Sequence, residues 1–240
     1  MLFKLKLMKN LLFLLLGLLM TTHLHAQFGI NAAYRFNNAP DLKIIKSFDG
    51  TNDEFEVLSN GFSIGMDYWF RLKNYRIEFL PELNYGQYNR NLQTDDETIA
   101  LKSGAASFFL NTNIYFLDLL GDCNCPTFSK QGPTINKGIF LQLSPGLTYW
   151  NQSYTSQSGD NEASNITFSI AAGLGVDIGI TDLITLTPFG GLRYYPEIEW
   201  TDLSVITDEY FLLEVKAEKS SLMQAYTGIR IGIRLDHENY

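Results

Sequence analysis

The side chains that most often carry enzyme chemistry are scarce in this sequence and lie far apart. The 240 residues include three histidines and two cysteines. His23 and His25 lie in a segment that we expect to be removed, and His237 lies near the C-terminus. A histidine base must lie within hydrogen-bond reach of the group that it deprotonates. The sequence therefore predicts that the protein is not an enzyme and has no cofactor or metal site.

Ten charged residues occupy alternate positions within apolar stretches, and a polar site could be built from them. They are Arg35, Asp67, Arg71, Arg76, Glu78, Glu82, Asp177, Arg193, Arg230 and Arg234. In a strand, Glu78 and Glu82 would lie ~13 Å apart at ~3.3 Å per residue, which is too far for an acid–base pair. Because an unpaired buried charge is costly, we expect a packed network of paired charges. The alternative is a channel that these charges line, through which a small molecule passes.

Cys123 and Cys125 are separated by one residue. In an oxidising compartment two such thiols predict a disulfide, in a ring so small that it would be strained and reducible. A zinc site would need further cysteine or histidine ligands. We expect a local structural clip, and a redox role is the alternative.

Alternating apolar and polar residues predict that strands position these side chains. From Gly61 to Tyr88 one face is apolar, as in Phe62, Ile64 and Met66, and the other face is mostly small or charged. Period-two alternation of this length indicates β-strands. An unbroken apolar face opposite a face of unlike charges is typical of a barrel with lipid outside and a polar interior.

Eight such runs can be counted, each long enough to cross a bilayer as a tilted strand of ~9–11 residues. They cover residues 28–37, 61–71, 75–86, 105–116, 139–150, 166–180, 184–195 and 223–235. The sequence therefore predicts an all-β protein: a monomeric, eight-stranded, antiparallel transmembrane β-barrel. A barrel of eight strands is only wide enough to be filled by its own side chains, so we expect a polar, filled lumen. A soluble lipocalin-like binder, with the apolar face inside, is the alternative fold.

Residues 1–26 have the composition of a cleaved secretory signal peptide. Three lysines precede the apolar run Leu11–Met20, and a small residue, Ala26, ends the segment. The run is shorter than the ~20 residues that a membrane-spanning helix needs, which argues against a helical anchor. We therefore expect residues 27–240 to form one outer-membrane β-barrel domain.

The lengths of the predicted connections indicate the orientation of the barrel. Two are tight turns, at residues 72–74 and 181–183, whereas four are long, at residues 38–60, 89–104, 151–165 and 196–222. Short periplasmic turns and long extracellular loops are the usual pattern in outer-membrane barrels. We expect the N-terminus in the periplasm and the four long loops outside the cell. The connection 117–138, which holds both cysteines, is a long periplasmic exception.

The chain is acidic, and this limits its partners. Without the three N-terminal lysines it has 15 basic and 26 acidic residues, so we expect no nucleic-acid partner. The long loops share this negative charge, which favours solubility. The alternatives are docking of a basic protein partner and divalent cations shared with the lipopolysaccharide surface. Outer-membrane lipid and lipopolysaccharide are the other partners that such a barrel implies.

The loop from Pro196 to Ser221 is too apolar for a plain solvated turn. Its apolar and aromatic residues include Trp200, Leu203, Val205, Tyr210, Phe211 and Leu213. One interpretation is a hairpin beyond the membrane, in which residues 199–206 pair with residues 210–218. The other is an exposed patch with an acidic rim, which is the composition of a partner-binding surface. In both cases we expect this loop to carry the main interaction of the protein.

Four short segments resemble outer-membrane β-barrel proteins of the PorT-like type. They are the end of the signal, Ala26-Gln27, PELNYG at 81–86, KGIFLQLSPGLTYW at 137–150 and PFGGLRYYPEI at 188–198. The resemblance implies an outer-membrane barrel over residues 28–235, and one branch of the family assists a secretion system. We expect a surface scaffold that acts through its extracellular loops without catalysis. The alternatives are an accessory subunit of a secretion machine and a small-molecule channel.

Overall fold

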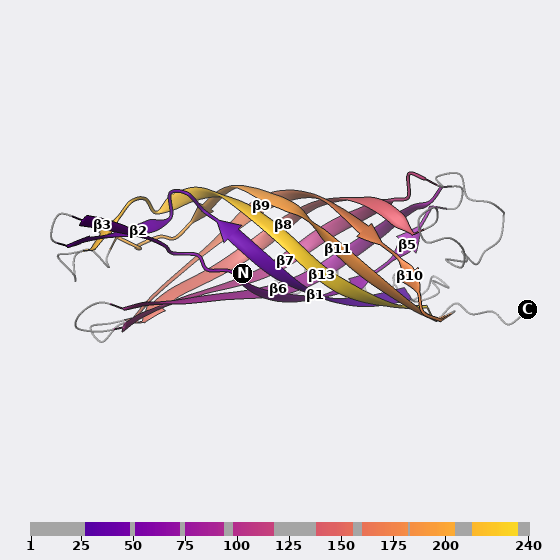
Figure 1. Ribbon diagram of the computed structural model, residues 1–240, viewed down its shortest axis with the longest axis horizontal. Coiled ribbons are helices and arrows are strands. Elements are labelled where there is room, and N and C mark those ends of the chain that lie inside the picture. The colour runs from indigo at the N-terminus through magenta and orange to yellow at the C-terminus, as the bar shows by residue number, and fades with distance from the viewer. Residues whose placement is uncertain are drawn as a thin grey trace, which may run out of the picture.

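The computed structural model describes residues 27–48, 51–72, 75–93, 98–117, 138–155, 160–181, 183–204 and 213–234 (Figure 1). The predicted signal peptide, residues 1–26, lies outside the described residues, as do Cys123 and Cys125. Every regular element in the described part of the chain is a β-strand. Within those same residues, no helix has the length and apolar character needed to span a membrane.

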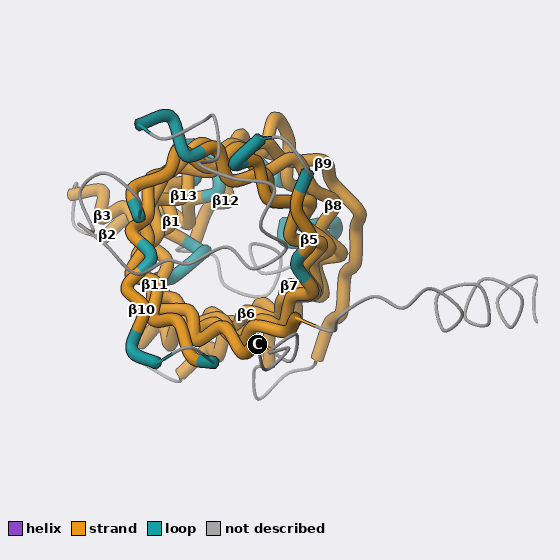
Figure 2. Tube along the Cα trace, turned by 90° about the vertical axis from the view of Figure 1, so that its right-hand side faces the viewer, coloured by secondary structure: helices purple, strands orange, loops and turns teal. Residues whose placement is uncertain are grey.

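Ten strands form one closed antiparallel barrel (Figures 1 and 2). Two of them continue another strand after one residue, so the barrel wall has eight strand positions, here called staves. The ten strands are β1 (Gln27–Asn38), β4 (Gly61–Tyr68), β5 (Phe70–Arg71), β6 (Ile77–Gln93), β7 (Thr98–Ile114), β8 (Ile139–Thr155), β9 (Asp160–Val176), β10 (Ile178–Gly179), β11 (Ile184–Glu199) and β13 (Lys219–Arg234). β5 continues β4 beyond Trp69, and β10 continues β9 beyond Asp177. Neighbouring staves pair in the order β11-β13-β1-β4-β6-β7-β8-β9, and β9 pairs with β11 to close the ring. The prediction of an all-β, eight-stranded antiparallel barrel is confirmed.

The outer surface of the barrel is an apolar belt, because apolar side chains alternate with buried inward residues along each stave. The belt includes Phe28, Ile30, Phe62, Ile64, Met66, Leu83, Phe108, Leu110, Leu147, Ile166, Phe168, Ile170, Leu174, Leu192, Ile229, Ile231 and Ile233. Aromatic rings meet near both of its ends, with centroids 5.6 Å apart for Phe28 and Tyr68 and 4.8 Å apart for Tyr34 and Phe62. A belt bounded by aromatic residues is the lipid-facing surface of a transmembrane barrel. A lipocalin-like fold would turn this face inward.

The belt stops well before the staves end, and beyond it the alternation changes phase. Outward residues become polar, as at Lys102, whereas inward residues become apolar, as at Leu92 and Ile99. Pairing continues between β6 and β7 up to Gln93 and Thr98, and between β8 and β9 up to Thr155 and Asp160. The prediction of loops at residues 89–104 and 151–165 is therefore wrong for the described residues of both ranges. A sheet in water also alternates, but it buries its apolar face and leaves the polar face outside.

A separate three-stranded sheet, here called the cap sheet, lies beyond the end of the barrel (Figure 1). It consists of β12 (Leu213–Val215), β2 (Lys43–Phe48) and β3 (Thr51–Glu56), in the order β12-β2-β3. The predicted loop 38–60 therefore contains a hairpin. The predicted pairing of residues 199–206 with 210–218 is wrong for the described residues, because the β11–β13 ladder ends at Glu199 and Lys219, after a register shift between Tyr195 and Ile198. β12 pairs with β2 instead.

We predict that Leu174→Arg destabilises the barrel by about 2–4 kcal/mol, because a charge on the lipid face near the midplane is costly. Leu174 is 58% exposed and lies in the middle of the belt. Gly175→Arg should also destabilise, but through crowding, since a Cβ at Gly175 would overlap the Phe140 ring. Urea titration of refolding in detergent micelles measures both changes.

The matched control is Thr155→Arg, an exposed outward position beyond the belt, which should have little effect on the free energy of unfolding. Equal tolerance at Leu174 and Thr155 would contradict the assignment of the outer face.

Candidate functional site

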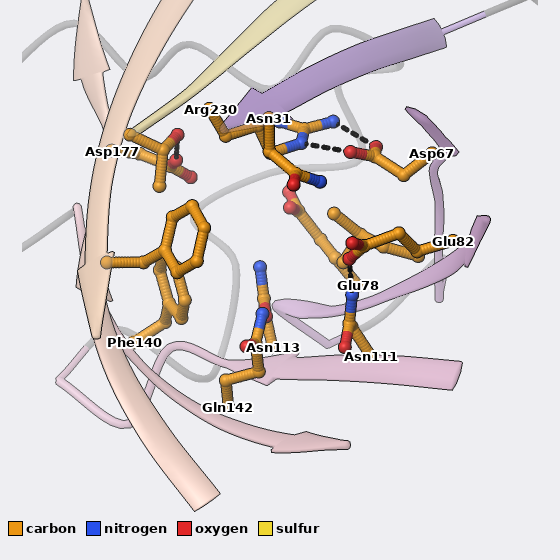
Figure 3. Close-up of a pocket in the computed structure, with 13 residues that line it drawn as sticks. Asn31, Asp67, Glu78, Glu82, Asn111, Asn113, Phe140, Gln142, Asp177 and Arg230 are labelled. Atoms are coloured by element: carbon orange, nitrogen blue, oxygen red, sulfur yellow. Dashed lines mark hydrogen bonds and ion pairs between the residues drawn. The ribbon is translucent and has the colours of Figure 1, made fainter. Parts of the chain in front are cut away.

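An ion pair between Arg230 and Asp67 lies in the lumen, toward the end of the barrel where β1 begins (Figure 3). Nε and Nη2 of Arg230 donate to the two carboxylate oxygens of Asp67 at 2.7 and 2.5 Å. The two residues come from β13 and β4, which are separated by β1. Gly29 of β1 is in register with Asp67, and a Cβ on this glycine would overlap the guanidinium. The glycine therefore lets Arg230 reach across one stave to its counter-charge.

Tyr115 joins two further carboxylates at the same end of the lumen. Its hydroxyl lies 2.8 Å from Oε2 of Glu78 and also contacts Oδ2 of Asp177. Thr187 donates to the other oxygen of Asp177, and the guanidinium carbon of Arg76 lies 4.7 Å from the centre of the Tyr115 ring. One hydroxyl hydrogen serves only one acceptor, so the second donor and the nearby cation help to stabilise the two carboxylates.

Glu82 connects this acidic end to the middle of the lumen. Its two carboxylate oxygens accept hydrogen bonds from Nδ2 of Asn84 at 2.9 Å and from Nδ2 of Asn111 at 2.5 Å. Oδ1 of Asn84 in turn accepts from Nη2 of Arg35 at 3.3 Å. An amide therefore bridges the carboxylate and the guanidinium, so that the hydrogen-bond chain is continuous from one layer of the lumen to the next.

Arg35 and Arg193 form an arginine layer across the middle of the lumen. Their guanidinium carbons lie 5.7 and 3.6 Å from the centre of the Phe109 ring. Arg35 donates to side-chain oxygens of β4 and β13 at 2.6 Å, and Arg193 donates to serine hydroxyls of β8 and β9 at 2.6 and 2.8 Å. Neither arginine forms an ion pair with a carboxylate of the described chain. The expected network of paired charges therefore does not include these two arginines within the described residues, where neutral dipoles and the aromatic ring stabilise them.

A small cavity of about 30 Å³ lies at the acidic end (Figure 3). Asp67, Glu78, Glu82, Asp177 and Arg230 are among its lining residues. This volume has room for about one or two water molecules, whereas sites for organic ligands occupy roughly 300–1,000 Å³. Within the described residues, no three histidine, cysteine, aspartate or glutamate side chains are placed to hold a metal ion. The geometry therefore offers no space for an organic substrate here.

Beyond the arginine layer the lumen is filled by an apolar cluster, here called the plug. Its barrel residues include Tyr88, Leu92, Ile99, Leu101, Trp150, Tyr154, Tyr195, Ile198 and Leu222, and the connections add Leu42, Ile44, Val57, Leu58, Trp200 and Leu203. The Trp150 ring centroid lies 5.7 Å from that of Tyr88 and 5.8 Å from that of Tyr195. The lumen is therefore polar only within the belt. Sequence analysis missed the plug, although its inward apolar alternation in residues 88–101 was a usable signal.

The structure brings most of the predicted lumen residues together inside the barrel. The buried ones are Arg35, Asp67, Arg76, Glu78, Glu82, Asp177, Arg193 and Arg230. Arg71 and Arg234 lie in paired strands opposite Glu78 and Gln27, and their side chains are outside the described residues.

The predicted partner loop is placed differently from the expectation. Trp200 and Leu203 are buried in the plug, so an exposed patch is wrong for these two residues. Asp202 between them has φ 62°, a left-handed conformation that aspartate adopts more readily than most residues, and this turn brings Leu203 back to the core. Leu213 begins β12, while Val205 and the pair Tyr210-Phe211 lie outside the described residues.

Two groups beyond the belt have shifted pKa values. Hydrogen bonds from the hydroxyl and the backbone N–H of Ser204 lower the pKa of the Glu218 carboxyl. Burial raises the pKa of the Tyr88 hydroxyl to about 12, so this hydroxyl stays protonated at neutral pH. Both shifts move the groups away from neutral pH, which does not favour a role in general acid–base catalysis.

Comparisons with known proteins give similarities to solved outer-membrane barrels. No protein-family model matches the chain, and the search of curated proteins finds no match. Ail, the attachment invasion locus protein of Yersinia pestis, is 11% identical with a TM-score of 0.42, over 88% of this chain and 100% of Ail. Neisserial surface protein A is 14% identical with a TM-score of 0.38, over 86% of this chain and 96% of that protein.

The N-terminal β-barrel domain of OprF from Pseudomonas aeruginosa is 14% identical with a TM-score of 0.39, over 86% of this chain and 97% of that domain. The resemblance to the PorT-like type stays a prediction. The assignment of this chain as a closed eight-stranded barrel rests on its own strand pairing.

We predict that Asp67→Asn lowers the free energy of unfolding by about 3 kcal/mol, because it leaves Arg230 buried without its counter-charge. The double variant Asp67→Asn with Arg230→Met should be more stable than the single variant, since it removes the unpaired charge. Urea titration in micelles measures all three proteins, with Asp53→Asn, at an exposed position of the cap sheet, as control. A double variant no more stable than Asp67→Asn would contradict direct pairing.

Proposed function

We propose that the protein is an outer-membrane barrel that presents the cap sheet at the cell surface as a binding site for another protein, without catalysis and without an open channel. The observation that carries this proposal is the cap sheet itself. It has an acidic edge that pairs with no described strand and lies outside the apolar belt, and its own side chains fix it to the barrel through the plug.

The positions of the chain ends support the orientation of the cap sheet toward the outside. β1 begins and β13 ends at the end of the barrel opposite the cap sheet, where Gln27 pairs with Arg234 (Figure 1). The turn between β10 and β11 lies at that end too and is tight, since Ile180 N–H donates to the Ile184 carbonyl at 2.9 Å. Outer-membrane barrels place their tight turns in the periplasm and their long extensions outside the cell.

Two successive barriers block the lumen, which supports a barrel without an open channel. The arginine layer crosses the lumen within the belt, and the plug fills it beyond the belt. Trp150, Leu203 and Leu222 in the plug have no exposed surface. A solute would therefore have to displace an apolar core as well as buried charges, which makes the channel the weaker hypothesis.

We predict that the purified protein gives no steady ion conductance in planar bilayers, because the plug and the arginine layer both block the lumen. A porin of known conductance is the positive control. Reproducible single-channel steps, altered by Arg193→Gln, would make the small-molecule channel the better hypothesis.

Main-chain groups of β3 form the open edge of the cap sheet. Val57 N–H donates to the Leu42 carbonyl at 3.1 Å, in the register that pairs β3 with β2. Because hydrogen-bonded pairs alternate in an antiparallel ladder, the N–H and C=O groups of Glu54 and Glu56 point away from β2. Arg90 of the barrel donates to the Glu56 carbonyl, which agrees with this direction, so an added strand would use the main-chain groups of Glu54. No described strand pairs with this edge of β3.

The side chains of β3 indicate the chemistry of the partner. Asp53, Glu54 and Glu56 are exposed, and Glu54 forms an ion pair with Lys43 at 2.6 Å. An extended segment with basic residues could add to this edge as a further strand, through main-chain hydrogen bonds. The acidic side chains would speed its encounter with the edge. In the PorT-like alternative that segment belongs to a component of a secretion machine.

We predict that the purified barrel enriches extended, basic peptides from a displayed random-peptide library. Glu54→Pro removes the main-chain donor at the open edge without removing a bond to β2, so it should weaken binding about tenfold or more. Glu54→Ala removes the charge but keeps the donor, and it should weaken binding less. Unchanged peptide affinity in Glu54→Pro, with the barrel still folded, would contradict strand addition at β3.

A further inference from the structure

A second hollow, here called the wall groove, lies on the outside of the barrel across β6, β7, β8 and β9. Its volume is about 270 Å³, and its lining residues include Tyr85, Lys102, Gly104, Tyr149, Asn151 and Glu162. The two tyrosines mark the end of the apolar belt on their staves. Lys102 and Asn151 belong to the part of the staves beyond the belt, here called the extension, where the outward residues are polar. The groove therefore crosses the boundary between belt and extension, which is the depth of lipid headgroups in a membrane.

The register of three staves creates the wall groove. On β7, Ala106 lies between Tyr85 of β6 and Tyr149 of β8, and Gly104 lies between two amide side chains. The central stave thus has small residues where both of its neighbours have large ones, and a trough results. A Cβ on Gly104 would stand 3.1 Å from the hydroxyl of Tyr85. A large side chain at this position would therefore close the trough.

The chemistry of the wall groove matches a phosphorylated sugar. Tyr85 and Tyr149 are about half exposed, and their rings can pack against the apolar face of a sugar ring. The amides of Gln87 and Asn151 both donate and accept hydrogen bonds, as sugar hydroxyls require. Lys102 of β7 supplies a positive charge for a phosphate, and Glu162 of β9, on the other side of Ser153, can accept hydrogen bonds from sugar hydroxyls. A few polar groups that converge on an aromatic hollow are the usual composition of a ligand site.

We propose that the wall groove binds the sugar-phosphate headgroup of an outer-leaflet glycolipid of the lipopolysaccharide class. Directly next to the groove, Leu83, Phe108 and Leu147 form an exposed apolar row of the belt. The acyl chains of the same lipid would lie along this row. A protein partner would need a larger contact surface than the trough offers. The site uses no residue of the cap sheet, but its place in the outer leaflet rests on the orientation of the barrel in the proposed function.

The test compares lipid binding by the folded protein and its variants in micelles, with diphosphoryl lipid A and phosphatidylglycerol as probes and native mass spectrometry as readout. Gly104→Phe fills the trough and Lys102→Gln removes the charge, so each should weaken lipid A binding about tenfold or more. Two matched controls should bind lipid A as the wild type does. They are Thr227→Phe, an outward position of β13, and Lys219→Gln, an exposed lysine outside the groove.

Heat-modifiable migration on gels verifies that each variant is folded, and Tyr149→Ser replaces Gly104→Phe if that variant does not fold. Equal lipid A affinity in the wild type and the groove variants would overturn the site. Equal affinity of the wild type for phosphatidylglycerol would overturn it as well, because that result describes general lipid contact. Equal affinity for the deacylated sugar phosphate would overturn the assignment to a membrane lipid in favour of a soluble saccharide.

Discussion

A sheet in a hydrocarbon layer must satisfy every backbone N–H and C=O group within itself, and the rest of this structure depends on that constraint. The first and last staves, β1 and β13, satisfy this constraint by pairing with each other, from Gln27–Arg234 to Asn38–Met223. Closure at eight staves leaves an interior that is only as wide as the side chains of its wall. The inward positions must therefore fill it, and the cavity of about 30 Å³ at the acidic end is small beside them.

Small residues beside large ones make this filling possible. Gly29 gives room to Arg230, Gly175 gives room to Phe140, and Gly146 lies against the Phe109 ring. Along the lumen, the polar layers are followed by the apolar plug, and this order depends on whether the outer face of the barrel meets lipid or water. Where the outer face meets lipid, polar side chains can only point inward. Where the outer face meets water, the inner face becomes an apolar core, as in a soluble sheet.

The staves within the belt could be predicted from the sequence, because lipid on one side requires apolar residues at every second position, as from Ile166 to Ile180. The parts of the staves that extend beyond the belt could not be predicted by that criterion. Near Tyr88 and Trp150 the apolar residues change from the outward to the inward positions. The cap sheet joins β12 to β2, which are far apart in the chain, and no local pattern indicates that pairing. The inward charges could be named, but their partners depend on register across β1, which the sequence does not reveal.

The pairing of β1 with β13 also governs the order in which the chain can assemble. Until Lys219–Arg234 has paired with it, one edge of β1 presents an unpaired row of hydrogen-bonding groups, which is a template for pairing with other chains. Contacts between the two ends of a chain carry the largest loop-closure entropy, so they form slowly. Closure of the barrel by pairing of β1 with β13 is therefore a late step in the folding of this chain.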